Sequence, residues 1–165
     1  MHLPKLSLHF LLSSYKSVWK RFPLTVFISL LLMGIILYLI EHEDSNSITP
    51  TLQHSLTKWA LALTLGIPLS IAARVIWEQY YRPSFGSFIF LNLLTLGLVF
   101  AYHFFSPIVI DSSPMILIYR YLGLLGISHL LVSIAPYLLR RNEEDFWEYN
   151  KQLFSHFILA VIYTL

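Results

Sequence analysis

The sequence predicts an all-α protein, a polytopic transmembrane helix bundle with an N-terminal interfacial amphipathic helix. The first indication is composition: of the 165 residues, 56% are hydrophobic and 12% are charged, about half of the ~25% charged residues in a typical soluble domain. The second is the length of the uncharged blocks. Residues 22–40 and 83–110 contain no Asp, Glu, Lys or Arg, and ~18 such residues are enough to indicate a spanning helix.

Residues 1–21 form the predicted interfacial helix. Large apolar residues recur there at spacings of three and four, which places them on one helix face with lysine and serine opposite. These residues, together with the first residue of the following span, are Leu8, Leu11, Leu12, Tyr15, Val18, Trp19 and Phe22. Such a helix suits the membrane surface, where lysines meet anionic headgroups, although a short solvated helix packed on the bundle is the alternative. A cleaved signal peptide is not expected, because no small-residue cleavage site follows the apolar run.

The transmembrane bundle is predicted to occupy residues 22–165. Its spans are expected at about 22–40, 58–77, 85–105, 115–139 and 153–165. Pro68 is expected to kink the second span, because its ring removes a backbone hydrogen bond. Asn142 is suited to cap a helix that climbs the surface before the fifth span. That span has thirteen residues against the ~20 needed to cross, so we expect it to be truncated and the chain to be a fragment.

The basic residues predict the orientation. Nine lie before the first span, between the second and third, or after the fourth: Lys5, Lys16, Lys20, Arg21, Arg74, Arg82, Arg140, Arg141 and Lys151. The intervening segments 41–58 and 106–114 carry one, Lys58. Because basic loops stay in the cytoplasm, we expect a multi-pass protein of the inner (cytoplasmic) membrane with a cytoplasmic N-terminus.

The fourth span carries the two candidate site residues, Arg120 and His129. They share a stripe with Gly123, Gly126, Ser133 and Pro136 at three- and four-residue steps. Ionisable residues within a membrane usually face the bundle interior or a wet cavity, which makes both functional candidates. The structural alternatives are that Arg120 snorkels to headgroups and that His129 bonds to a neighbouring helix.

Two further stripes contain small and weakly polar residues. In the second span they are Ala62, Gly66, Ser70 and Ala73, and in the third Asn92, Thr95, Tyr102 and Ser106, with His103 beside them. We interpret both as helix–helix packing faces; the functional alternative is a polar path between spans two, three and four. Arg74 and Glu78, four residues apart, are expected to pair.

The sequence gives no support for an enzyme. It lacks the common nucleophile, zinc, phosphate-loop and dinucleotide motifs, and it has no cysteine. The segment Glu41-His42-Glu43-Asp44, with His54, has suitable metal ligands but not the spacing of a zinc motif, so a solvated acidic loop is expected. No catalytic residue, metal or cofactor is therefore predicted, and the few basic residues do not indicate nucleic acid.

Several segments, in order, resemble an uncharacterised family of bacterial multi-span membrane proteins, domain of unknown function 4153. They are Lys20-Arg21-Phe22-Pro23-Leu24, Leu65-Gly66-Ile67-Pro68-Leu69-Ser70, Arg120-Tyr121-Leu122 with His129-Leu130-Leu131-Val132, Ala135-Pro136-Tyr137, and residues 146–154. The resemblance covers nearly the whole chain except the loop 41–57. It implies the fold and a longer protein, which agrees with a truncated fifth span. The family has no established activity, so it implies no site residues.

Two functions remain open from the sequence. The first is a non-enzymatic structural or accessory membrane component. The second is part of a transporter or channel, with Arg120 and His129 near a polar path between spans two to four. The expected partners are membrane lipids, the remainder of the chain and other membrane proteins.

Overall fold

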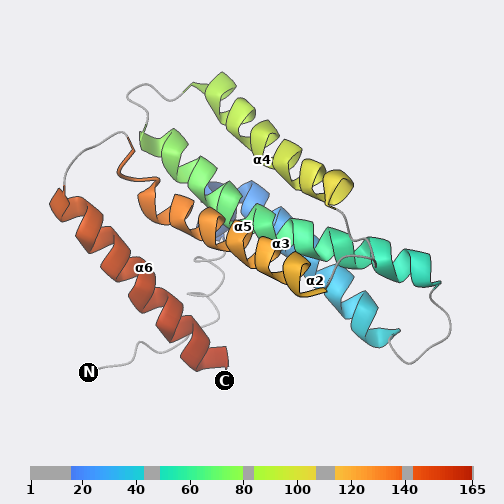
Figure 1. The fold of residues 1–165 in the computed structure, drawn as a ribbon. Coiled ribbons are helices and arrows are strands. Elements are labelled where there is room, and N and C mark those ends of the chain that lie inside the picture. The colour runs from blue at the N-terminus through green and yellow to red at the C-terminus, as the bar shows by residue number, and fades with distance from the viewer. Residues whose placement is uncertain (1–15, 43–48, 80–83, 107–113, 139–142, 165) are drawn as a thin grey trace.

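The computed structural model describes residues 16–42, 49–79, 84–106, 114–138 and 143–164 (Figure 1). Within these ranges the chain is helical and contains no strand. The helices are α2 (Pro23–Glu41), α3 (Pro50–Gln79), α4 (Phe85–Phe105), α5 (Pro114–Ile134) and α6 (Glu143–Thr164). Helix α3 lies in the middle and contacts α2, α4 and α5, while α6 contacts α5. Helices α2 to α5 alternate in direction along the bundle (Figure 1).

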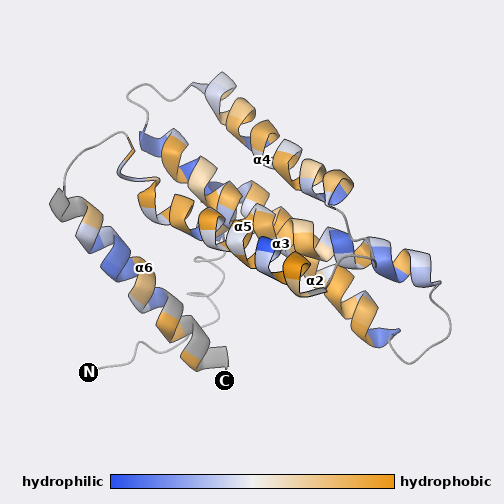
Figure 2. Ribbon diagram, in the orientation of Figure 1, coloured by the Kyte–Doolittle hydropathy of each residue, from blue (hydrophilic) through white to orange (hydrophobic). Residues whose placement is uncertain are grey.

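Four helices, α2 to α5, are long and apolar enough to cross a membrane. Their large apolar side chains face outward, as shown by Leu37, which is 56% exposed, and Leu130, which is 61% exposed. Hydrophobic residues dominate α2, α4 and α5, whereas hydrophilic residues recur along α6 (Figure 2). Because outward apolar surface is stable in lipid and not in water, the chain is a multi-pass membrane protein.

The helix ends refine the predicted spans. Helices α2 and α4 agree with the predicted 22–40 and 85–105 to within a residue. Helix α5 ends at Ile134 rather than at 139, because the α conformation is disfavoured before a proline and Pro136 lies in the turn that follows. One helix runs from Glu143 to Thr164, as the acidic first turn suggested. Of the predicted interfacial helix, residues 16–21 are helical, and residues 1–15 lie outside the described part.

Helix α3 begins at Pro50, eight residues before the predicted start of the second span, and has 30 residues. At 1.5 Å per residue it is ~45 Å long, more than the ~30 Å of hydrocarbon in a bilayer. Its first turns extend past the ends of α4 and α5 (Figure 1). The helix continues through Pro68.

Helices pack closely at Gly66, midway along α3. A Cβ atom there would lie 2.8 Å from Cγ2 of Val99 on α4 and 3.3 Å from Cδ1 of Ile28 on α2. Ala62, Ser70 and Ala73 are buried on the same stripe. The prediction that this stripe is a helix–helix packing face is confirmed, because only small side chains let three helices approach so closely.

Candidate functional site

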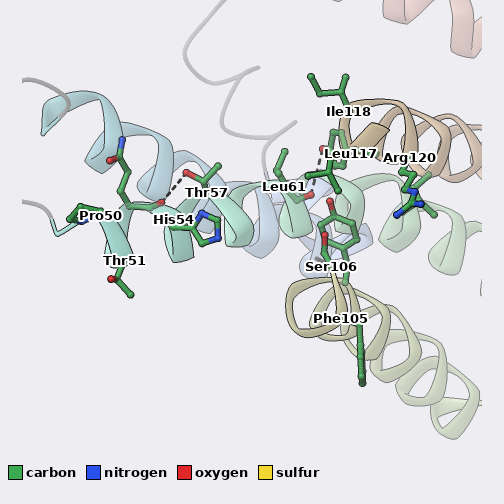
Figure 3. A pocket seen from close by; sticks show the side chains of 14 residues that line it. Pro50, Thr51, His54, Thr57, Leu61, Phe105, Ser106, Leu117, Ile118 and Arg120 are labelled. Carbon is green, nitrogen blue, oxygen red and sulfur yellow. Dashed lines mark hydrogen bonds between the residues drawn. The ribbon is translucent and has the colours of Figure 1, made fainter. Parts of the chain in front are cut away.

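The side chain of Arg120 lines a cavity between the first half of α3, the end of α4 and the start of α5. The cavity has a volume of about 1000 Å³ and is open on one side. Figure 3 shows the lining side chains arriving from all three helices. They are Pro50, Thr51, Gln53, His54, Thr57, Leu61, Tyr102, Phe105, Ser106, Leu117, Ile118, Arg120, Tyr121 and Leu124.

The cavity exists because its three helices end at different levels. The early turns of α3 form one long wall, and α4 ends at Phe105 while α5 begins at Pro114. Polar side chains such as Thr51, His54 and Thr57 come from the projecting part of α3, and leucines line the deeper part. The cavity lining therefore combines a mostly apolar wall with a few polar side chains.

Arg120 is the one lining residue with a full charge, and no acidic residue shares the lining. Its side chain is exposed, and no carboxylate among the described residues forms an ion pair with it. Tyr121 lies beside it and donates to the Leu61 carbonyl across a long 3.5 Å. A cation in a spanning helix without a protein counter-charge attracts an anion.

His129, the other candidate, does not line this cavity. It is exposed, and its Nδ1 lies 2.9 Å from the carbonyl oxygen of Leu125 one turn earlier on the same helix. The structure therefore does not bring the two predicted site residues together. We expected His129 to need a neighbouring helix, a water or a ligand; that reasoning was incomplete, because a histidine ring can reach the carbonyl four residues before it.

The glycines of the Arg120 stripe are also uncovered. A Cβ added to Gly123 or Gly126 would meet nothing within 4 Å. These two glycines do not pack against the described helices, because α3 contacts α5 through a different face, which includes Val132 and Ala135. A regular spacing identifies a stripe but not the neighbour that it faces.

At the opposite end of α3, three charged residues form an ionic cluster. The Arg21 guanidinium donates to both oxygens of Glu78, from Nε at 3.2 Å and from the terminal nitrogen at 2.8 Å. Arg74 donates to the same carboxylate at 3.0 Å, which confirms the predicted Arg74–Glu78 pair. Arg21 was not predicted as a member, because it lies 57 residues from Glu78 in the sequence.

Aromatic side chains surround this ionic cluster. The Arg74 guanidinium lies 4.4 Å from the ring centre of Trp77 and 5.3 Å from that of Phe88 on α4, distances typical of cation–π contacts. The Trp77 indole donates to the Ser84 carbonyl at 3.0 Å. The cluster thus joins the segment before α2 to the end of α3 and the start of α4.

Among the groups outside the spans, Arg21 and Tyr149 near the cluster have shifted pKa values. The hydrogen bond to Glu78 raises the pKa of the Arg21 guanidinium, although partial burial opposes the rise. Burial raises the pKa of the Tyr149 phenol on α6, and the positive charge of Arg21 opposes that rise. Both groups keep their ordinary charge near neutral pH, so the cluster is a constant ionic contact.

Most polar side chains in the described spans bond to the backbone of their own helix. Thr64, Asn92, Thr95 and Ser128 each donate to a carbonyl three or four residues earlier. Thr25 and Ser70 also make a contact between helices, since their hydroxyl oxygens lie 2.8 Å apart across α2 and α3. Own-helix bonding satisfies a polar group in lipid without a water path.

At the cavity end of the bundle, His103 stacks on Trp59 with ring centres 3.9 Å apart. Its Nδ1 is buried and has no hydrogen-bond partner among the described residues. The described residues contain no group of three or more His, Cys, Asp or Glu that could hold a metal ion. Glu43 and Asp44 lie outside the described part, and His54 lines the cavity.

No protein-family model matches the chain, and no curated protein or solved structure is significantly similar to it. The resemblance to the uncharacterised bacterial family therefore stays a prediction from the sequence.

Proposed function

We propose that this chain is a non-enzymatic structural or accessory component of the inner (cytoplasmic) membrane, with its N-terminus in the cytoplasm. The observation that supports it most is how polar groups are satisfied within the spans. Asn92, Thr95 and Ser128 bond to their own helices, so they are not held free to bind a passing solute. The middle of α3 instead packs closely against its neighbours, as at Gly66.

The uncovered face of α5 is where we expect a membrane protein partner. Gly123 and Gly126 are open, and small residues are the usual contact surface between helices in lipid. The partner is either another membrane protein or a further part of the same chain. Partner contact would also remove His129 from lipid.

Site-specific photo-crosslinking in membranes tests this role. A photoreactive residue replacing Ile127 on α5, which is 64% exposed, should form a protein adduct of defined mass. The matched control is Leu37 on α2, which is 56% exposed in a run of large apolar residues and should react with lipid. Equal, lipid-only reaction at both positions would contradict an accessory role for this face.

The alternative is that the chain is part of a transporter or channel, with a polar path between spans two to four. The cavity lined by Arg120 favours this reading, since it lies between α3, α4 and α5. Transport requires the path to continue toward the other face, through the region of Thr64 and Thr95. Vesicles containing the chain and loaded with reporters of pH, potassium and chloride distinguish the two functions. Flux above that of empty vesicles, lost in Arg120→Gln, would favour transport.

A further inference from the structure

We propose that the cavity between α3, α4 and α5 binds one glycerophospholipid, with the lipid phosphate paired to Arg120. The lipid belongs to the leaflet on the side where α3 begins. The proposal goes beyond the accessory role and does not depend on it, because a bound lipid is compatible with either function considered above.

Charge is the first argument. Arg120 is the single charged residue of the lining, and no carboxylate in the described part of the chain neutralises it. The guanidinium of arginine is a planar fork that can donate two parallel hydrogen bonds to one phosphate. The opposite end of α3 shows the contrast, because there Glu78 accepts from two arginines. At Arg120 the counter-charge has to come from outside the described chain.

The neighbouring phenols are the second argument. Tyr121 lies next to Arg120 in sequence, and its hydroxyl reaches the Leu61 carbonyl at 3.5 Å, which is at the limit for a hydrogen bond. Tyr102 faces it from α4, with ring centres 6.1 Å apart. Both residues line the cavity. Each phenol can donate to a phosphate oxygen, and tyrosines are enriched at the depth of lipid headgroups.

The cavity lining is also mixed in polarity. Toward the end of the bundle the lining contains Thr51, His54 and Thr57, whereas Leu61 and Leu124 lie at the deeper end. Figure 3 shows Arg120 on the α5 side, past Leu61 and at the far end of the lining from Pro50 and Thr57. An apolar lining with a polar stretch at one end and Arg120 at the other matches an amphiphilic molecule whose anionic group meets the arginine. A soluble anion would leave the leucine lining in contact with water.

Size and access are the third argument. A volume of about 1000 Å³ is at the upper end of the ~300–1,000 Å³ of typical ligand pockets. It accommodates a headgroup with the first part of its acyl chains. Because the cavity is open on one side, the remainder of the chains can stay in the bilayer. The lipid would then enter sideways without passing through water.

Native mass spectrometry of the chain in dodecyl maltoside micelles tests the proposal. The probes are phosphatidylglycerol and a diacylglycerol with the same acyl chains, which lacks the phosphate. We expect one phosphatidylglycerol to stay bound to the wild-type chain and diacylglycerol to bind about tenfold less. Arg120→Gln should also bind phosphatidylglycerol about tenfold less, the effect of losing one charged hydrogen-bonded contact. Lys151→Gln, an exposed cation on α6, should bind it like the wild type.

Three results would overturn the proposal. They are equal retention of phosphatidylglycerol by wild type and Arg120→Gln, equal retention of diacylglycerol and phosphatidylglycerol by the wild type, and displacement of the lipid by millimolar inorganic phosphate. The last would indicate a site for a free anion. If Arg120→Gln loses its helical circular dichroism, the Leu124→Trp variant is tested for lipid retention instead. This variant keeps the Arg120 charge, and its larger side chain fills the cavity. Reduced retention in Leu124→Trp supports the lipid site, and unchanged retention contradicts it.

Discussion

The two ends of α3 differ in how a neighbouring arginine is neutralised. At one end Arg21 and Arg74 share the carboxylate of Glu78, and the junction between helices is closed. At the other end Arg120 has no carboxylate among the described residues, and the helices leave a cavity of about 1000 Å³. An arginine at a membrane boundary therefore does not define a role by itself. What distinguishes the two ends is whether the chain supplies the counter-charge.

The largest expected difference between the two ends is the side of the membrane on which they lie. The chain has no cysteine, so a single introduced cysteine is the only residue of the protein that reacts with a thiol reagent. Thr51→Cys at the exposed start of α3 should react completely with an impermeant thiol reagent added outside intact cells. Lys20→Cys, exposed near the ionic cluster, should react after the membrane is opened. The reverse pattern would refute the proposed orientation.

Between the ends, α3 is expected to tolerate no added volume. Gly66→Ala puts a methyl group 2.8 Å from Val99, and overpacking of this kind costs about 1–3 kcal/mol. Gly126→Ala on α5 is the matched control, because nothing lies within 4 Å of its added Cβ. Denaturant titration in mixed micelles measures both free energies of unfolding. Equal stability of the two variants would mean that α2, α3 and α4 are not packed as described.

Neutralising one charge should affect the two ends differently. Glu78→Gln removes the carboxylate that two arginines share, and we expect a loss of about 1 kcal/mol because the contacts are partly exposed and screened. Arg120→Gln breaks no ion pair among the described residues, so its free energy of unfolding in lipid-free detergent should be unchanged. The same denaturant titration measures the free energies of unfolding of Glu78→Gln and Arg120→Gln. A larger loss in Arg120→Gln would show that Arg120 has a protein partner.

The smallest expected effect is at the hydroxyl pair near the ionic cluster. Thr25→Val and Ser70→Ala each remove one side of the 2.8 Å contact between α2 and α3. Their coupling in a double-mutant cycle should be about 0.6 kcal/mol, the average for such bonds between membrane helices. The Ser70 hydroxyl also donates to the Ile67 carbonyl of its own helix. A coupling of zero would mean that the helix contact depends on apolar packing alone.

Sequence reasoning predicted what depends on neighbours in the chain. The length of the apolar blocks identified α2 and α4 closely, and four-residue spacing identified the Arg74–Glu78 pair. Contacts between distant segments were not predicted, as with Arg21 and Glu78. The prolines that begin α3 and follow α5 moved the helix ends by several residues.

For the candidate site, sequence reasoning identified the right kind of residue but not its surroundings. An arginine inside a span was recognised as significant, and the structure places Arg120 on a cavity. His129 was grouped with it by spacing, but it bonds to Leu125 and lies elsewhere. The cavity depends on the unequal ends of α3, α4 and α5, which no local pattern specifies.

The unequal lengths of the helices also bear on which membranes suit this protein. Helix α2 has 19 residues and α3 has 30, about 28 Å and 45 Å. A bilayer matched to α2 leaves the first turns of α3, with Gln53 and His54, in the headgroup layer. A thicker bilayer would draw these polar turns into hydrocarbon, and tilting α3 would not prevent this, because tilt shortens the distance that a helix spans along the bilayer normal. Hydrophobic mismatch would then sort the protein toward thinner membranes.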